Sequence, residues 1–279
     1  MRVLVTGAKG QLGTAVMRAL SARRIPCLGV DQQDFDLTDG AAVRACVRAC
    51  QPGAIIHCAA YTAVDRAETE TARCCQVNAM GTLNVVRAAL ETGAKLVYVS
   101  TDYVFDGRLG RPCQPGDVAN PLNIYGLSKW QGEQAVRGMM QRFFIVRTGW
   151  LYSEGHGFVA DILRLGAERD TLRVVSDQIG TPTYAPDLAA TLCDLVQTGC
   201  YGVYHAAGSG SCSRYELACE ALRVASIPSK VVPVDSAAFH TPARRPLDTR
   251  LDCSSLKEDA GLALLPDWRD SLRRCIHGA

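Results

Sequence analysis

Short apolar runs alternate with amphipathic stretches through the first half of the chain. The runs are rich in Val, Ile and Leu, which predicts buried β-strands, and the stretches between them have helical spacing. The runs lie at residues 2–6, 27–30, 54–59, 96–99 and 143–147, and the main helical stretches at 41–51, at 71–90 and from 123 or 124 onward. Strands that alternate with helices in this way predict a mostly parallel, doubly wound α/β sheet within residues 1–150.

After Trp150 the alternation loosens, and neither a second glycine loop nor an internal repeat occurs. Helices are expected near residues 158–169, 187–197 and 215–225, and short strands near 173–175 and 203–205. We therefore expect a smaller C-terminal α/β substrate domain, residues 151–279, over the carboxyl edge of the sheet. Some of its segments are expected to be interleaved with the first domain.

The composition narrows the class of protein. Of the 279 residues 48% are hydrophobic, enough for a large core, and the net charge of +2 includes no basic stripe for nucleic acid. No apolar run approaches the roughly 18 residues of a membrane-spanning helix, and a first strand at Arg2 leaves no room for a signal peptide. The thirteen cysteines are odd in number and form no Cys-x-x-Cys pair, which predicts reduced thiols and no metal site. We expect a cytoplasmic protein without nucleic-acid or membrane partners.

A glycine-rich turn follows the first strand and precedes a helix that runs to about residue 23. Gly7, Gly10 and Gly13 are spaced three apart, whereas the commonest dinucleotide fingerprint is Gly-x-Gly-x-x-Gly. Such glycines let the backbone approach a pyrophosphate, which then binds the free N–H groups at the helix N-terminus. A Rossmann-like, dinucleotide-binding first domain is therefore predicted, and a purely structural turn is the alternative.

A carboxylate stands at the end of the second strand. Asp31 can accept hydrogen bonds from ribose hydroxyls and would repel a 2′-phosphate, which favours NADH. An ordinary turn residue is the alternative interpretation. Asp36 and Leu37, a few residues further on, are candidates for contact with the adenine.

A tyrosine and a lysine four residues apart carry the candidate chemistry. Tyr125 and Lys129 share one face of the predicted helix, so a phenol and an ammonium converge, and the cation is expected to lower the pKa of the phenol. Thr101 ends the strand at 96–99 and would bring its hydroxyl to the same edge of the sheet. Three groups would then meet at one carbonyl. The alternative is a surface helix whose lysine extends past a half-buried tyrosine.

Two loops stand out in the second half. The stretch 177–183 reads Asp-Gln-Ile-Gly-Thr-Pro-Thr, and 241–246 reads Thr-Pro-Ala-Arg-Arg-Pro. The pair Arg244 and Arg245, braced by prolines, could hold a diphosphate bidentately. A solvated basic turn is an equally good interpretation.

With these motifs in this order, the chain resembles the extended short-chain dehydrogenase/reductase superfamily and, within it, the dTDP-4-dehydrorhamnose reductase family. The resemblance spans nearly the whole chain, and several of its motifs are rare outside this family. They lie at residues 59–68 (AAYTAVDRAE), 100–105 (STDYVF), 147–150 (RTGW), 177–183 (DQIGTPT), 241–246 (TPARRP) and 265–268 (LPDW).

The resemblance implies reduction of the C4 ketone of dTDP-6-deoxy-L-lyxo-4-hexulose with NADPH or NADH, giving dTDP-L-rhamnose, by a monomer or homodimer. Tyr125 would donate the proton, Lys129 would bind the nicotinamide ribose, and Thr101 would polarise the ketone. Asp102 and Trp150, with Thr101, would contact the sugar nucleotide. The residues that would line the cofactor are Gly10, Gln11, Leu12, Asp31, Asp36, Leu37, Ala60, Tyr61 and Thr62.

Two positions depart from the family pattern. Tyr61 stands where many members have His, which alters a cofactor contact, and Ala15 stands where many bacterial members have a Glu linked to a Mg²⁺-bridged dimer. The alternatives are a reductase of another 4-keto nucleotide sugar and a non-catalytic regulatory subunit of the methionine adenosyltransferase type. Intact Thr101, Tyr125 and Lys129 favour an enzyme.

Overall fold

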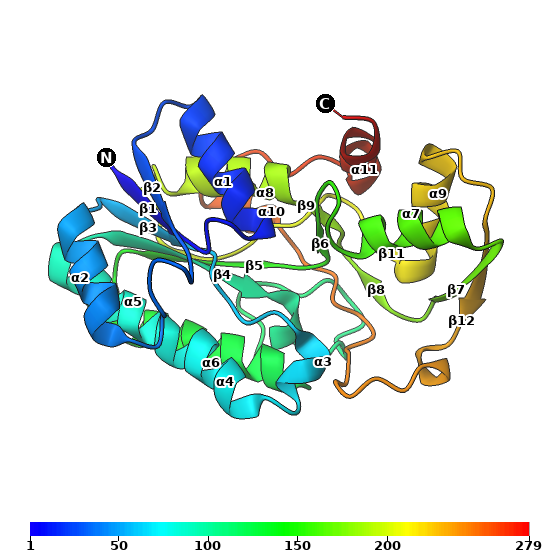
Figure 1. Cartoon of the computed structure of the whole chain (residues 1–279), viewed down its shortest axis with the longest axis horizontal. Coiled ribbons are helices and arrows are strands. Elements are labelled where there is room, and N and C mark those ends of the chain that lie inside the picture. The colour runs from blue at the N-terminus through cyan, green and yellow to red at the C-terminus, as the bar shows by residue number, and fades with distance from the viewer. Residues whose placement is uncertain (279) are drawn as a thin grey trace.

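Six parallel strands form the centre of the molecule (Figure 1). The computed structural model describes residues 1–278. The strand order is β10-β5-β4-β3-β1-β2. The chain runs from β1 to β2 at one edge and then returns to β3 on the other side of β1, so the sheet has a topological switch point between β1 and β3. This confirms the predicted doubly wound parallel sheet. The strands are β1 (Val3–Thr6), β2 (Cys27–Val30), β3 (Ala54–His57), β4 (Lys95–Thr101), β5 (Phe143–Thr148) and β10 (Gly202–His205).

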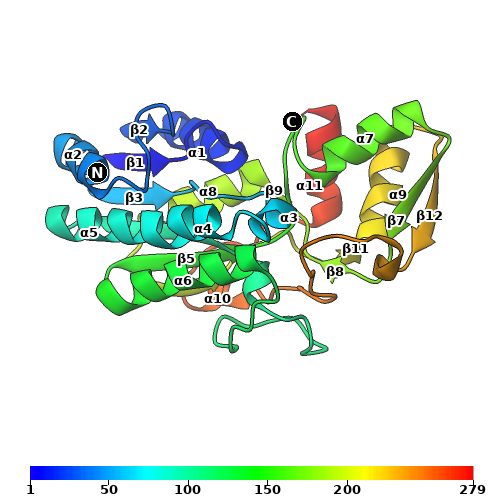
Figure 2. The same cartoon turned by 60° about the horizontal axis from the view of Figure 1, so that its bottom comes forward.

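Helices cover both faces of this sheet, which is why its central strands are apolar without alternation. All four residues of β1 and of β3 are buried. Helices α1 (Gln11–Ala22) and α8 (Ala185–Leu195) pack on one face, where they share a core cluster with β1. Helices α2 (Gly40–Cys50), α5 (Thr82–Thr92) and α6 (Ile124–Met139) lie on the opposite face (Figures 1 and 2).

The segment expected as one long helix over residues 71–90 is helical but not uniform. It consists of α4 (Thr71–Cys75), a π-helical turn η1 (Gln76–Gly81) and α5. Asn78 lies in the π turn and is buried. π turns inside α-helices occur frequently at functional sites, because the extra residue redirects a side chain.

A second lobe lies beside the carboxyl ends of the strands (Figure 2). Its core cluster includes Tyr152, Ile162, Leu217 and Trp268. The elements that build it are β6 (Leu151–Tyr152), α7 (Phe158–Glu168), β7 (Thr171–Val175), β8 (Ile179–Gly180), β9 (Thr183–Tyr184), β11 (Cys212–Ser213), α9 (Arg214–Val224), β12 (Lys230–Val234) and α11 (Trp268–His277). The remaining elements are two short α-helices, α3 (Val64–Ala67) and α10 (Ser254–Glu258), and two 3-10 helices, η2 (Asp102–Val104) and η3 (Ser236–Ala238).

The chain crosses between the lobes more than once. Helix α8 packs against α1, and β10 forms the edge of the central sheet beside β5. Both come from the part of the sequence expected in the substrate domain, which was also expected to be interleaved with the first. The boundary near residue 150 stays a prediction.

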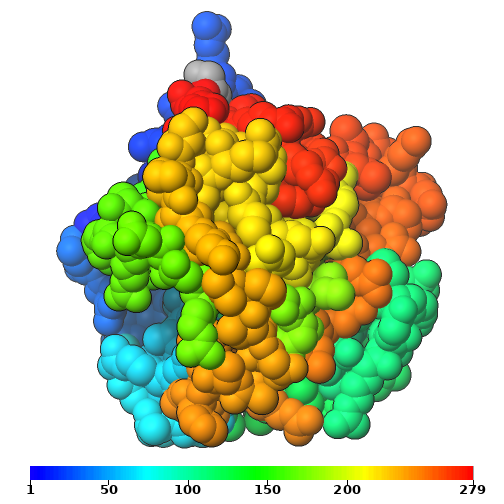
Figure 3. Space-filling view, turned by 90° about the vertical axis from the view of Figure 1, so that its right-hand side faces the viewer, coloured from blue at the N-terminus to red at the C-terminus, as the bar shows by residue number. Residues whose placement is uncertain are grey.

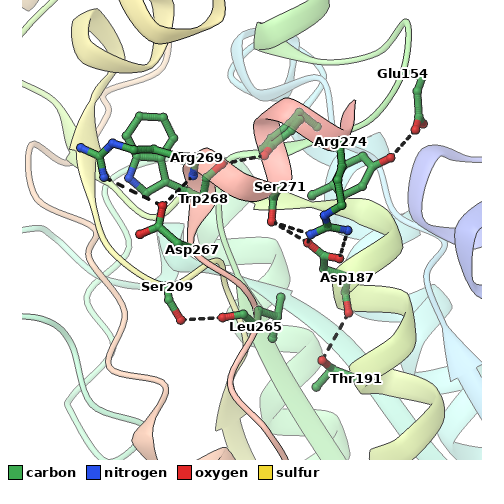
Figure 4. A network of polar contacts seen from close by, with 12 residues as sticks. Glu154, Asp187, Thr191, Ser209, Leu265, Asp267, Trp268, Arg269, Ser271 and Arg274 are labelled. Carbon is green, nitrogen blue, oxygen red and sulfur yellow. Dashed lines mark hydrogen bonds and ion pairs between the residues drawn. The ribbon is translucent and has the colours of Figure 1, made fainter. Parts of the chain in front are cut away.

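Helix α11 fastens the second lobe to α8 (Figure 4). Asp187 of α8 accepts hydrogen bonds from both terminal nitrogens of Arg274, at 2.8 and 2.7 Å, and from Ser271 Oγ at 2.6 Å. Trp268, at the start of α11, is 1% exposed. Within residues 1–278 no helix is long and apolar enough to span a membrane.

Candidate active site

A cavity of about 830 Å³ opens at the carboxyl ends of β1, β3, β4 and β5. Every residue of the proposed cofactor, catalytic and sugar-contact sets lines it, whereas Arg244 and Arg245, proposed to hold a diphosphate, do not. From the cofactor set these are Gly7, Gly10, Gln11, Leu12, Gly13, Asp31, Asp36, Leu37, Ala60, Tyr61 and Thr62. From the catalytic and substrate sets they are Thr101, Asp102, Tyr125, Lys129 and Trp150. Their roles stay predictions, but the structure brings them together.

The glycine turn leaves the N-terminus of α1 open to this cavity. Gly7 has φ +67°, and a Cβ there would lie 2.7 Å from the backbone nitrogen of Ala59. A Cβ at Gly13 would lie 2.0 Å from the carbonyl oxygen of Gly7, so only glycine allows this close packing. The cap residue Gly10 contributes no side-chain hydrogen bond. Gln11 Nε2 is buried without a partner. Free N–H donors at a helix start fit a bound diphosphate.

The part of the cavity around Asp31 holds charges of both signs. Asp31 accepts hydrogen bonds from the backbone N–H groups of Lys9 and Gln32, each at 2.8 Å. The Lys9 ammonium bonds the side chain of Gln33, beside Asp31. Arg73 lines the same region and lies 3.3 Å from Asp36. Arg73 is therefore a cation that lines the same part of the cavity as Asp31 and Asp36.

Asn78 fixes the backbone at Tyr61. Its Oδ1 accepts the Tyr61 N–H at 2.8 Å, and its Nδ2 donates to the Tyr61 carbonyl at 3.0 Å and to Ser128 Oγ at 2.9 Å. The Tyr61 hydroxyl donates to Glu70 at 2.7 Å. The π turn thus connects the loop after β3 to the helix that carries Tyr125 and Lys129.

Helix α6 begins beside the cavity because Asn123 caps it, its Oδ1 accepting the Gly126 N–H at 2.8 Å. Lys129 is 3% exposed, and its Nζ lies 4.2 Å from the ring centre of Tyr98. Burial lowers the pKa of Lys129 to about 7, although the charge of Glu133 acts in the opposite direction. The ammonium is therefore held in a nearly dry site.

The pKa of Tyr125 is raised, not lowered, mainly by burial, and a hydrogen bond with Thr101 offsets part of this rise. The expectation that Lys129 depresses the pKa of the phenol was wrong for the protein without bound ligand. The physical reason is that burial disfavours the charged phenolate, and the neighbouring charge of Asp102 adds to the rise. A neutral phenol is nevertheless the form that donates a proton.

Thr101 and Asp102 form the floor of the site. Thr101 Oγ1 donates to Asp102 Oδ1 at 3.0 Å, and Asp102 Oδ2 is buried without a partner. Burial raises the pKa of Asp102 to about 6. A Cβ at Gly149 would lie 2.6 Å from Asp102 Oδ2, which explains the glycine before Trp150. Trp150 itself has φ +48°, an uncommon conformation for a side chain of its size.

The sequence analysis did not propose several of the cavity residues, among them Arg73, Arg214 and Tyr103. The guanidinium of Arg214 lies 3.6 Å above the Trp150 ring, and burial lowers its pKa, an effect that Tyr103 and the charge of Asp102 partly offset. The Tyr103 ring meets that of Tyr125 edge-on, 6.1 Å between centres. A signal for Arg214 existed, because the capping box Ser213-x-x-Glu216 marks it as the first residue of α9.

A second cavity, of about 1350 Å³, continues from the first between the lobes. Arg214 and Phe158 line both. The second cavity has an excess of positive charge. Its charged lining residues are Arg108, Arg164, Arg173, Arg214, Arg244 and Arg245, against Asp65, Asp106 and Asp161.

The two arginines of the 241–246 loop make different contacts. Arg245 binds Asp65 of α3 through two hydrogen bonds of 3.0 and 2.8 Å and so joins the lobes. Arg244 is exposed, and its carbonyl accepts a hydrogen bond from Asn123 at 2.8 Å. Figure 3 shows this orange segment beside the cyan segment that includes α3. Neither sequence interpretation anticipated the ion pair.

Comparison with known proteins gives consistent results. Residues 1–279 match the family of the RmlD substrate binding domain. The chain is 41% identical to the dTDP-4-dehydrorhamnose reductase of Streptomyces griseus, over 97% of this chain and 91% of that protein. It is 37% identical to the dTDP-4-keto-6-deoxy-D-glucose reductase of Streptomyces niveus, over 99% and 96%.

Solved structures show the same relationship. The dTDP-4-dehydrorhamnose reductase of Bacillus anthracis in complex with NADP superposes with a TM-score of 0.96 at 40% identity, covering 100% of this chain and 99% of that one. The UDP-glucose 4-epimerase of Thermus thermophilus complexed with NAD superposes with a TM-score of 0.81 at 22% identity, covering 100% of both chains, which is a likeness of fold.

Proposed function

Because this chain belongs to the RmlD substrate binding domain family, whose relatives include dTDP-4-dehydrorhamnose reductases, we propose that it reduces the C4 ketone of dTDP-6-deoxy-L-lyxo-4-hexulose to dTDP-L-rhamnose. The observation that carries the proposal is the meeting of Thr101, Tyr125 and Lys129 in one cavity with the glycine turn. A binding protein would need the cavity but not this combination of hydroxyl, phenol and ammonium.

NADPH or NADH would occupy the first cavity and supply the hydride. The Gly10 N–H already donates to the Gly7 carbonyl at 3.0 Å, so the backbone N–H of Gln11, at the start of α1, is the donor placed to bind its diphosphate, and the unpartnered Gln11 Nε2 offers a further one. Asp31 would accept from the ribose hydroxyls of NADH, whereas Lys9 and Arg73 would bind a 2′-phosphate. The chain therefore carries groups that suit either cofactor.

The proton would come from Tyr125. Burial keeps this phenol protonated at neutral pH, so it can neutralise the negative charge that grows on the ketone oxygen. Thr101 would turn its single hydroxyl proton, which Asp102 Oδ1 accepts at 3.0 Å in the structure, towards the same oxygen and orient it. Lys129 would bind the ribose next to the nicotinamide, and its charge would stabilise the phenolate left behind.

The substrate would extend from this centre into the second cavity. The sugar would lie between Thr101, Asp102 and Trp150, and the junction with the second cavity is where the diphosphate of a sugar nucleotide would begin. Arg214 stands at that junction, held flat on Trp150, with its N–H edge available to a phosphate. The excess of arginine over aspartate in the second cavity suits the two negative charges of the diphosphate.

Turnover tests the proposal directly. Purified protein with NADPH or NADH and the keto sugar should lose nicotinamide absorbance, and mass spectrometry should find a product heavier by two hydrogens. The Streptomyces niveus relative makes another 4-keto nucleotide sugar the second candidate, so dTDP-4-keto-6-deoxy-D-glucose is the matched comparison substrate. No turnover of either sugar would favour the regulatory-subunit alternative.

A further inference from the structure

A buried ion pair lies directly behind the catalytic centre. Glu133, on α6, is wholly buried, and Arg147, on β5, is 2% exposed. Arg147 Nε donates to Glu133 Oε1 at 2.9 Å and Nη2 donates to Oε2 at 2.7 Å. Ser100 Oγ on β4 donates to Oε1 at 2.6 Å. Both carboxylate oxygens are therefore engaged, by two neighbouring strands.

Stability alone is a poor explanation for this pair, because replacing a buried ion pair by apolar residues of similar volume is often neutral or stabilising. Its position suggests another reason. Ser100 and Arg147 face each other in the register of β4 and β5, and each precedes a cavity residue, Thr101 and Thr148 respectively. Glu133 follows Lys129 by four residues, one helical turn along α6.

The part of the Arg147 guanidinium that faces away from Glu133 is also held by contacts. Its Nη1 donates to the Pro115 carbonyl at 3.1 Å, and its guanidinium carbon lies 5.0 Å from the Phe105 ring centre. His205 lies 3.5 Å from Nη1, and burial lowers its pKa to about 3, so it is neutral at physiological pH. Arg147 is thus fixed on both sides, and its guanidinium pairs with the Glu133 carboxylate.

Other titratable groups around Lys129 are uncharged near neutral pH. Burial lowers the pKa of His57 to about 3 and raises those of the Cys58 thiol, to about 12, and the Cys74 thiol. Tyr98 and Tyr125 likewise have raised pKa values. On the side of Glu133, Arg137 approaches its carboxylate at 3.9 Å. Among the groups that affect the pKa of Lys129, Glu133 is therefore the one that supplies a full negative charge.

We propose that Glu133 is a positioning residue, which locks α6 to β4 and β5 through Ser100 and Arg147 and holds a negative charge one helical turn behind Lys129. Tyr125 and Lys129 are then fixed relative to Thr101. The proposal rests on the proposed function in one respect, that Lys129 acts in its ammonium form.

Glu133→Gln keeps the shape of the side chain and removes its charge. Without that charge the amine loses its proton at lower pH, so the alkaline limb of the kcat–pH profile should move down by about one pH unit. Activity lost at pH 8 should then be largely recovered at pH 6. A purely structural role would instead lower kcat by the same factor at every pH, and an alkaline limb at the wild-type position would overturn the proposal.

Ser100→Ala is the matched control, because it removes one hydrogen bond and keeps the carboxylate. Its thermal midpoint should fall, but its alkaline limb should stay at the wild-type pH. Should Glu133→Gln fail to fold with Arg147 unpaired, Glu133→Gln combined with Arg147→Met removes both charges. That variant should show the same displaced limb, and a wild-type limb would count against the proposal.

NADPH binding gives a readout that needs no sugar substrate. The affinity, measured by fluorescence titration between pH 6 and 9, should weaken with rising pH as Lys129 loses its proton, and should do so at lower pH in Glu133→Gln. Coincident curves for wild type and variant would overturn the proposal even where no keto sugar is turned over. Failure of the proposed function would show instead as normal binding curves with no turnover.

Discussion

Desolvation governs the acidity of Tyr125, and this determines what its removal should do. Tyr125→Phe keeps the ring and its contact with Tyr103 but removes the proton donor. General acid catalysis is typically worth about 10²–10⁴-fold, so kcat should fall by roughly that factor while NADPH affinity stays nearly constant. Steady-state kinetics and a binding titration measure the two quantities.

Lys129→Met is the comparison variant for Tyr125→Phe. It removes the ribose contact as well as the charge, so cofactor binding and kcat should weaken together. A Tyr125→Phe protein that reduces the keto sugar at the wild-type rate would remove the phenol from the mechanism.

Asp31 offers a second test at a single residue. Its carboxylate lies beside Lys9, whose ammonium bonds Gln33. Asp31→Ala should raise the preference for NADPH over NADH by roughly tenfold, because repulsion of the 2′-phosphate is lost, which corresponds to about 1.4 kcal/mol. Lys9→Met should move the preference towards NADH. The ratio of kcat/KM for the two cofactors measures both, and an unchanged ratio in Asp31→Ala would exclude this role.

Residues near strand ends were predictable individually because parallel strands present their carboxyl ends at one edge. That is why Thr101 and Asp31 could be placed in one site from sequence. Arg214 and Tyr103 could not be paired in this way. Arg214 comes from the second lobe and reaches Trp150 only through the packing of the lobes, which local periodicity does not encode.

At the level of elements, hydrophobic periodicity predicted where helices form better than what they pack against. The helix expected at 187–197 is α8, which starts at Ala185 and carries a proline in its first turn. Its apolar residues Leu188 and Leu192 are fully buried, but periodicity alone cannot say that α1 and the sheet cover them. The π turn around Asn78 could not be predicted from periodicity either, because the contacts made there, hydrogen bonds to Tyr61 and Ser128, join segments far apart in the sequence.

The junction between α8 and α11 gives an element-scale prediction (Figure 4). Asp187→Ala leaves Ser271 Oγ and Arg274 without their acceptor. The free energy of unfolding should fall by about 1–3 kcal/mol, the usual value for hydrogen bonds to a charged group in a partly buried site. Urea unfolding followed by circular dichroism measures it.

The same helix supplies a matched control for Asp187→Ala. Asp270 pairs with Arg273 at 2.7 Å, but the two side chains are 64% and 50% exposed. Asp270→Ala should change the free energy of unfolding by no more than about 0.5 kcal/mol. Equal losses in the two variants would mean that Asp187 does not fasten the lobes.

For the whole molecule, buried ionisable groups determine how stability depends on pH. Burial lowers the pKa of His57 and of His205 from 6.5 to about 3, so the unfolded chain binds more protons between these values. The free energy of unfolding therefore falls as pH drops from about 6.5 towards 3. Asp102 opposes this trend, because its pKa is raised from 3.8 to about 6 and the cost of burying its charge disappears as pH falls through that range.

Lys129 affects the free energy of unfolding at neutral to alkaline pH. Its pKa is lowered from 10.5 to about 7, so the cost of burying the ammonium is complete below pH 7 and is relieved as pH rises towards 10.5. The protein without ligands should therefore gain stability from pH 5 to about pH 9, since two histidines outweigh Asp102 at the acidic end. Above pH 9 buried thiols such as Cys58, with a pKa raised to about 12, reverse the trend, because they ionise more readily in the unfolded chain.

Urea unfolding at pH 5, 6, 7, 8 and 9 tests this profile, and two variants assign its slopes. His205→Asn should flatten the rise between pH 5 and 6.5 without affecting the range above pH 7. Lys129→Met should do the reverse, and it should also be more stable than wild type at pH 7, because an apolar side chain replaces a buried charge. A wild-type slope above pH 7 that persists in Lys129→Met would show that the buried amine is not its source.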